Sequence, residues 1–266
     1  MSQPSPVRSA PRATNAARPG SDHPGDHRRE MLIALVSQRS GTALRIGLPI
    51  SVALAAVFYF FPGIDIGVSG IFFDPQLVTA TEGTGFWLKE SPTLNFLFWF
   101  VDVVSRGVLV IAIGLMIYFA VKRHPRLLAT TIVTLSLILG PALIVNSVLK
   151  DHWDRARPRT VEVFGGTQKF TPAWVVSDQC SRNCSFTSGH AAAGFAFLVG
   201  HFVAKTRLWL FLGLFSGLSI GIARVAVGAH FLSDVLFSGV VVYLVTALMA
   251  SILVTIARAS TRRSRA

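Results

Sequence analysis

The stretch LNFLFWFVDVVSRGVLVIAIGLMIYFA, residues 94–120, is almost wholly apolar, and its charged residues are Asp102 and Arg106. An α-helix needs about 20 predominantly apolar residues to cross a hydrocarbon core of about 30 Å. Windows of this composition, including this one, predict spans near residues 44–62, 94–120, 127–149, 190–205, 208–226 and 233–257. The expected fold class is therefore all-α, a polytopic membrane protein with six transmembrane helices, of which the fourth is short for a span.

The overall composition also indicates a membrane protein. Of the 266 residues, 52% are hydrophobic and 14% are charged, which is far from the balance of a soluble domain. Residues 1–30 are rich in Pro, Ser, Ala and Arg, a composition typical of disorder. We therefore expect a disordered basic tail over residues 1–42, one membrane domain over residues 43–258 and a second basic tail over residues 259–266.

The positions of Lys and Arg predict the orientation in the membrane. Six spans place both termini on one side, and short basic loops stay cytoplasmic. The terminal side is expected to be cytoplasmic because it carries Arg39, Arg45, Lys122, Arg123, Arg126, Lys205, Arg207 and the tail from Arg258 to Arg265. The opposite loops also carry basic residues, against this rule, which indicates a local role for Lys150, Arg155, Arg157, Arg159 and Arg182.

The formal net charge of +12 raises nucleic acid as a partner. The charges are, however, scattered over loop ends and form no patch with interleaved aromatic residues. We therefore expect no nucleic-acid partner, and the sequence indicates no obligatory protein partner.

The first of three polar segments on the outer side is KDHWDRARP, residues 150–158. Lys150 and Arg157 are seven residues apart, close to two helical turns, so a helix here would present both cations on one face. Two such cations suit a tetrahedral dianion, Arg as a planar fork and Lys as a point charge. The alternative is a solvated basic cluster at the membrane surface.

The second segment is TSGH, residues 187–190. Ser188 stands at the expected N-cap of a helix, and Gly189 allows backbone to approach closely. The free N–H groups of such a helix start form an anion site, with His190 in the first turn. An interfacial histidine without a catalytic role is the alternative.

The third segment is ARVAVGAHFLSD, residues 223–234. On a helix, Asp234 would lie beside His230, four residues away, and would hold one ring nitrogen while the other remains a nucleophile. Arg224 lies on another face of any continuous helix, so we expect a break at Gly228 that turns Arg224 toward His230. The alternative is a His–Asp pair that only stabilises the fold.

Together these segments combine three cations, a helix start rich in free amides and two histidines, a set suited to phosphoryl transfer. The sequence contains no glycine-rich P-loop, no carboxylate cluster for Mg²⁺ and no Cys/His spacing for zinc. We therefore expect neither a metal ion nor another cofactor. A competing class is a non-catalytic transporter or assembly protein that binds an anion, but simple anion binding does not require His190, His230 and Asp234.

The three segments resemble the signature of the type 2 phosphatidic acid phosphatase superfamily. That signature is Lys, six residues, Arg-Pro; then Pro-Ser-Gly-His; then Ser-Arg, five residues, His, three residues, Asp. The first segment matches throughout, the second has Thr187 in place of proline, and the third has Ala223 in place of serine. The resemblance implies a six-span layout over roughly residues 44–257. It also implies site roles: phosphate ligands Lys150, Arg157, Ser188, Gly189 and Arg224, general acid His190, nucleophile His230 and its orienting carboxylate Asp234.

The same residues occur in soluble haloperoxidases that bind vanadate, but the hydropathy of this chain argues against that class. The segments NCSF (183–186) and FFDP (72–75) and the cysteine pair resemble the bacterial lipid A phosphatases within the superfamily. This resemblance implies a bacterial inner-membrane enzyme that dephosphorylates lipid A at the periplasmic face through a phosphohistidine. Undecaprenyl diphosphate and phosphatidylglycerophosphate remain alternative substrates, because the site residues contact only phosphate.

Two further pairs of residues carry expectations. Cys180 and Cys184 lie in the outer loop, where a periplasmic location favours a disulfide. Asp102 and Arg106 are four residues apart within a span, where charges are expensive unless paired. We interpret them as a structural ion pair.

Overall fold

The computed structural model describes residues 24–78 and 85–265, and these residues form helices and connecting loops without regular β-strands. The long helices are α1 (Pro24–Phe60), α3 (Pro92–Val121), α4 (Leu127–Leu137), α8 (Leu208–Ala226) and α9 (Leu232–Arg265). Short helices are α2 (Gly63–Gly70), α5 (Lys150–His152), α6 (Gly189–Phe195) and α7 (Leu198–Val203). A π-helix, η2 (Ile138–Leu149), joins α4 to α5, and 3-10 turns are η1 (Pro75–Leu77), η3 (Pro158–Thr160) and η4 (Glu162–Phe164).

Among the described residues, five helices are long and apolar enough to cross a membrane: 27–60, 92–121, 127–152, 208–226 and 232–263. The prediction of a helical membrane protein is confirmed, whereas the count of six spans is not. The segment expected as the fourth span forms α6 and α7, which together cover only Gly189–Val203. At 1.5 Å per residue this segment is shorter than the hydrocarbon core.

The segment α6–α7 is short and lies within the bundle. Its side chains Ala191, Ala192, Phe195, Leu198, Val199 and Phe202 are buried. A Cβ added at Gly194 would come within 2.8 Å of the Cα of Gly217, so that α6 and α8 touch through glycines. The guanidinium of Arg39 in α1 donates to the carbonyl oxygens of His201, Ala204 and Lys205, which satisfies the orphan acceptors at the end of α7.

Both terminal helices extend beyond their predicted ends. The expected tail over residues 1–42 is wrong for residues 24–42, because α1 begins at Pro24, and α9 continues to Arg265 instead of giving way to a tail at 259. The two helices pack against each other and bury Ile33 and Val36 of α1 with Ala250 and Val254 of α9. Residues 1–23 and 266, the rest of the expected tails, lie outside the described residues.

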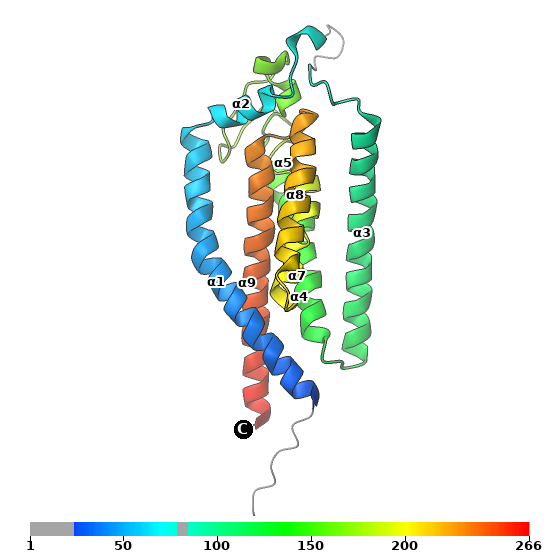
Figure 1. Cartoon of the computed structure of the whole chain (residues 1–266). Helices are drawn as coiled ribbons and strands as arrows, with labels where there is room; N and C mark the ends of the chain where they lie inside the picture. Colours follow the sequence, from blue (N-terminus) through cyan, green and yellow to red (C-terminus); the bar gives the residue numbers. More distant parts are fainter. Residues whose placement is uncertain (1–23, 79–84, 266) are drawn as a thin grey trace, which may run out of the picture.

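The third span contains a local change of helix type. Pro141 stands in the π-helix η2, and a proline removes one backbone donor and displaces the preceding turn, which a wider helix accommodates. The helix nevertheless continues to His152. It therefore delivers Lys150 to the same end of the molecule as the loops that precede α3 and α6 (Figure 1).

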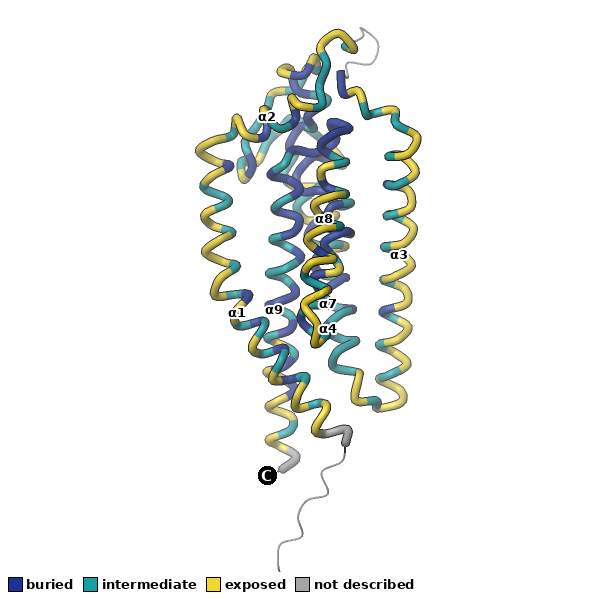
Figure 2. The backbone as a smooth tube through the Cα atoms, in the orientation of Figure 1, coloured by how far each residue is buried: buried dark blue, intermediate teal, exposed yellow. Residues whose placement is uncertain are grey.

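Burial is concentrated in α9, α6 and the loops at one end of the bundle (Figure 2). Helix α3 stands apart and is largely exposed, and among its residues Phe98 and Ala112 are buried. The described chain starts and ends at the opposite end of the bundle (Figure 1). The polar segments predicted from the sequence therefore gather at the end remote from the termini.

Candidate active site

The connection between α8 and α9 places His230. Helix α8 ends at Ala226, and Gly228 adopts φ +64°, a conformation that favours glycine. A Cβ at Gly228 would also lie 2.5 Å from the ring of Phe86. The predicted break at Gly228 is therefore confirmed. His230 itself precedes α9, which begins at Leu232, so the expectation that His230 and Asp234 share a helix is wrong.

His230 is buried with 1% of its surface exposed, and its Nδ1 lies 2.7 Å from the carbonyl oxygen of Ser185. A carbonyl only accepts, so Nδ1 carries the hydrogen and Nε2 keeps a free lone pair. Asp234 Oδ2 lies further away, 3.8 Å from Nδ1. Ser185 is thus the nearer partner of the ring, which the sequence did not predict. Burial lowers the pKa of His230 to about 3, with Asp234 opposing and Arg224 and Arg157 adding to the effect.

Asp234 is held by a buried network that sequence reasoning missed. Arg155 Nη1 lies 2.6 Å from Asp234 Oδ1, and its Nη2 lies 2.8 Å from Asp65 Oδ2, with all three side chains fully buried. Ser185 Oγ donates to Asp234 Oδ2 over 2.5 Å, and the backbone N–H of Phe231 donates to the same oxygen over 2.8 Å. The sequence did single out Arg155, because it is a basic residue on the outer side, whereas short basic loops are expected on the cytoplasmic side.

Asp65 of α2 completes this network. Its carboxylate accepts from the backbone N–H of Ser233 over 2.9 Å and from the Ser233 hydroxyl over 2.5 Å. Burial raises the pKa of Asp65, and the neighbouring guanidinium of Arg155 opposes this rise. Nothing local in the sequence around Asp65 indicates this contact, because its partners follow much later in the chain.

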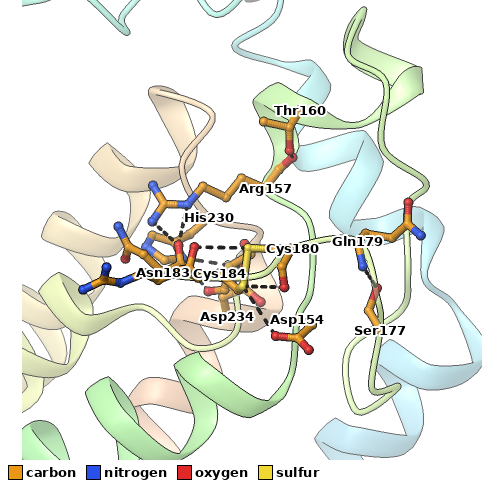
Figure 3. The surroundings of a disulfide bond; sticks show 12 residues. Asp154, Arg157, Thr160, Ser177, Gln179, Cys180, Asn183, Cys184, His230 and Asp234 are labelled. Carbon is orange, nitrogen blue, oxygen red and sulfur yellow. Dashed lines mark hydrogen bonds and ion pairs between the residues drawn. A yellow bond between two sulfur atoms is a disulfide. The ribbon is translucent and has the colours of Figure 1, made fainter.

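Arg157 reaches the site by a different backbone path from the expected one. Helix α5 ends at His152, Asp154 has φ +48° and Arg157 is extended with ψ 153°. The predicted helix carrying Lys150 and Arg157 is therefore wrong, because the chain turns before Pro158. Arg157 donates from Nη2 (2.6 Å) and Nε (3.2 Å) to the carbonyl oxygen of Asn183 (Figure 3). Burial and the charge of Arg159 lower the pKa of Arg157 to about 10.

The carbonyl that holds Arg157 belongs to a small loop closed by sulfur. Cys180 and Cys184 are joined in a disulfide with Cα atoms 5.7 Å apart. Figure 3 shows this bridge beside Asn183, with Arg157, His230 and Asp234 in the same region. The disulfide therefore closes the loop whose Asn183 carbonyl holds Arg157, one of the predicted phosphate ligands.

The start of α6 has the predicted cap. The Ser188 side chain accepts from the backbone N–H of Ala191 over 3.4 Å. A Cβ at Gly189 would lie 2.2 Å from Asn146 Oδ1, so the backbone here approaches η2 as closely as glycine allows. His190 follows in the first turn, with Nε2 3.5 Å from Asp102 Oδ1.

The cations converge on both histidines. The charges of Arg224 and Lys150 act on His190, and those of Arg224 and Arg157 act on His230. Arg224 lies over the ring of Phe98, with Cζ 4.4 Å from the ring centre. Its buried Nε has no hydrogen-bond partner among the described residues. A buried, unpartnered guanidinium N–H is costly unless a ligand accepts from it.

The structure therefore brings the eight predicted site residues to one end of the bundle, although they come from separate segments: Lys150, Arg157, Ser188, Gly189, His190, Arg224, His230 and Asp234. Within residues 24–78 and 85–265, no group of three His, Cys, Asp or Glu side chains is arranged to hold a metal ion. The arrangement offers three cations for an anion, one neutral imidazole with a free lone pair and a second imidazole beside a carboxylate.

Comparison with known proteins agrees with this geometry. A family model described as the PAP2 superfamily matches residues 129–258. The chain is 35% identical over 210 residues to the lipid A 4'-phosphatase of Francisella tularensis subsp. novicida (strain U112), covering 76% of this chain and 91% of the relative. It is 36% identical over 200 residues to the lipid A 4'-phosphatase of Rhizobium leguminosarum, covering 69% and 84%.

A third relative, the lipid A 4'-phosphatase of Rhizobium etli, is 34% identical over 200 residues, covering 69% of this chain and 76% of the relative. No solved structure matches the chain significantly. The family model covers all three polar segments, and with the extent of the matches to the relatives it shows that the chain belongs to the PAP2 superfamily, in its bacterial lipid A phosphatase group, and is a membrane lipid phosphatase.

Proposed function

We propose that this phosphatase removes the 4'-phosphate of lipid A, without a metal ion, through a phosphohistidine on His230. The observation that carries the proposal is the buried His230, whose Nδ1 is held by the Ser185 carbonyl, together with the buried Nε of Arg224, which has no hydrogen-bond partner among the described residues. The substrate follows from the relatives, which are lipid A 4'-phosphatases matched over most of their length.

In the first half-reaction, His230 Nε2 attacks phosphorus and forms an N–P bond while the bond from phosphorus to the lipid oxygen breaks. Lys150, Arg157 and Arg224 stabilise the equatorial oxygens of the loose transition state. His190 gives its proton to the departing lipid oxygen, and Nδ1–H of His230 stays on the Ser185 carbonyl. In the second half, water attacks phosphorus, His190 takes the water's proton and the N–P bond breaks to release inorganic phosphate.

Substrate binding favours protonation of the His190 imidazole. Burial and the neighbouring charges of Arg224 and Lys150 disfavour a positive charge on His190. A bound phosphate dianion neutralises these cations and makes the imidazolium favourable. The acid therefore becomes protonated when there is a leaving group to protonate.

The test is release of inorganic phosphate by the purified full-length protein from a panel of lipid phosphates in EDTA. We expect lipid A to be the best substrate and mass spectrometry of the product to show loss at the 4' position. Faster turnover of undecaprenyl diphosphate or phosphatidylglycerophosphate would contradict the proposed substrate. Activity that EDTA abolishes and Mg²⁺ restores would contradict the metal-independent mechanism, and no release from any lipid by folded protein would favour a non-catalytic anion-binding protein.

A further inference from the structure

Asp102 is a charged residue that neither the three motifs nor the mechanism above explains. It lies in the apolar helix α3, where an ionisable residue is expensive and usually functional. The sequence predicts an ion pair with Arg106, and the structure places Arg106 Nη2 3.5 Å from Asp102 Oδ2. The two side chains are 77% and 47% exposed, so this pair does not enclose Asp102 and leaves its other carboxylate oxygen available to a second partner.

The other oxygen of Asp102 lies at the site. Asp102 Oδ1 is 3.5 Å from His190 Nε2. One turn earlier in α3, the ring of Phe98 lies edge-on to His190 at 5.4 Å and under the guanidinium of Arg224 at 4.4 Å. Phe98 and Asp102 thus form the wall of the site that α3 provides, and their position fixes which face of the His190 ring is covered.

We propose that Asp102 is the positioning residue of the general acid His190, and this inference rests on the proposed function. The carboxylate holds Nε2–H and orients the ring so that Nδ1 faces the departing lipid oxygen. Protonated His190 gives its Nδ1 proton to that oxygen and becomes a neutral imidazole that still carries Nε2–H. Asp102 remains a carboxylate throughout, so the proton that His190 loses is the one that the lipid oxygen gains.

The charges around His190 explain why a carboxylate is needed there. Burial, Arg224 from α8 and Lys150 from the end of the third span all act against a protonated imidazole, and Asp102 from α3 is the negative charge that opposes them. A carboxylate beside an imidazole favours its protonated form. Each histidine of the site thus has its own carboxylate, Asp234 for His230 and Asp102 for His190.

The experiment compares Asp102→Asn, Asp102→Glu and the matched control Arg106→Gln in the full-length protein. Arg106→Gln removes the ion pair within α3 and leaves the contact with His190 in place. Each variant is assayed on lipid A, whose alcohol is a poor leaving group, and on p-nitrophenyl phosphate, whose leaving group barely needs a proton. Because general acid catalysis is worth about 10²–10⁴-fold, Asp102→Asn should lower kcat on lipid A by about 10²-fold with little change in KM.

In the first half-reaction on p-nitrophenyl phosphate, measured as the burst of p-nitrophenol, Asp102→Asn should stay within about threefold of wild type, because acid catalysis contributes little to that step. Asp102→Glu should recover at least about tenfold of the lost rate on lipid A, since it restores the charge. Arg106→Gln should remain within about threefold of wild type on both substrates. The alkaline limb of the kcat–pH profile on lipid A should move about 1 pH unit lower in Asp102→Asn, because the imidazolium loses its carboxylate.

Three results would overturn the assignment. Equal losses of Asp102→Asn on both substrates, or an unshifted pH profile, would reduce Asp102 to a structural role. A loss in Arg106→Gln that equals that of Asp102→Asn would restore the ion-pair interpretation. The pH profile uses lipid A alone and decides the matter even where the aryl ester reacts slowly. Failure of the proposed function is a separate result, because wild type would then release no phosphate from any lipid.

Discussion

At the scale of single residues, the two histidines differ in what holds them. His230 is buried and hydrogen-bonded through Nδ1 to the Ser185 carbonyl, whereas His190 lies at a helix start with Nε2 toward Asp102. A fixed neutral imidazole suits attack on phosphorus, and an imidazole near a carboxylate suits proton donation. The roles of the two rings are therefore separable by experiment.

We predict that His230→Ala abolishes phosphoenzyme formation with every substrate. His190→Ala should lose about 10²–10⁴-fold in rate on lipid A and keep measurable turnover of p-nitrophenyl phosphate, whose leaving group needs little protonation. The measurement is trapping of labelled phosphoenzyme from the activated ester, with folding checked by size-exclusion chromatography. Label on His230→Ala and none on His190→Ala would mean that the nucleophile and the acid are exchanged.

Arg155 provides a second prediction at this scale, because its guanidinium is the cation between the buried carboxylates of Asp65 and Asp234. Removing one partner of a buried ion pair typically costs about 3–5 kcal/mol, since the remaining charge is left uncompensated. Arg155→Met should therefore lower the apparent unfolding free energy in detergent by about this amount. Arg182→Met, an exposed cation in the same loop, is the control and should stay within about 0.5 kcal/mol. A stable, active Arg155→Met protein would contradict the structural importance of the network.

At the scale of elements, the loop closed by Cys180 and Cys184 determines where Arg157 points. Asn183 within this loop has φ +53°, and its carbonyl accepts twice from the Arg157 guanidinium. A crosslink reduces the freedom of the loop that carries this acceptor. Arg157, the proposed phosphate ligand, is thus positioned by backbone from another segment and not by its own helix.

We predict that the double variant Cys180→Ser, Cys184→Ser binds vanadate about tenfold more weakly than the oxidised protein. Vanadate can adopt five-coordinate geometry and therefore reports on the transition-state site, and a loss of about 1.4 kcal/mol of positioning corresponds to tenfold. Reduction of the wild type should produce the same weakening, whereas reduction of the double variant should change nothing. Unchanged vanadate inhibition in the double variant would separate the disulfide from the site.

The boundaries of some helices could be predicted from the sequence, and those of others could not. The spans containing Asp102 and starting at Leu208 were predicted within two residues, because an uninterrupted apolar run and the polar residues at its ends are local signals. The extra turns of α1 and α9 were missed because Ile33 and Val36 become apolar contacts only once α9 lies beside them. Their partners follow at the far end of the chain.

The same distinction holds for the site. The spacing of Lys150, Arg157, Arg224 and His230 could suggest them as site residues because each motif is short and continuous. The contact of Arg155 with Asp65 joins the loop after α5 to α2, and that of Asp102 with His190 joins α3 to α6. Such contacts depend on helix packing, which no spacing within one segment encodes.

At the scale of the whole molecule, the number of times that the chain runs along the bundle constrains its membrane topology. The start of α1 and the end of α9 lie at one end of the bundle (Figure 1), so the chain makes an even number of passes along it. In the part of the chain that the structure describes, five helices are long enough to span, and α6–α7 is the apolar segment available for a further pass. We propose that this short pass crosses the membrane beside α8 and that the termini are cytoplasmic, because Arg258, Arg262 and Arg263 lie at their end.

Truncation fusions to a reporter that is active only in the periplasm test this topology. We expect activity after Glu90 and after Thr171, which lie at the end of the bundle that carries the site, and none after His124, Lys205 or Ala266. The fusion after Lys205 is decisive, because its reporter becomes active if α6–α7 turns back without crossing. In that case five passes would also carry the fusion after Ala266 into the periplasm. An active reporter after both Lys205 and Ala266 would therefore refute the six-pass topology. Activity after Ala266 together with an inactive reporter after Thr171 would mean that the whole bundle is inverted and that the site faces the cytoplasm.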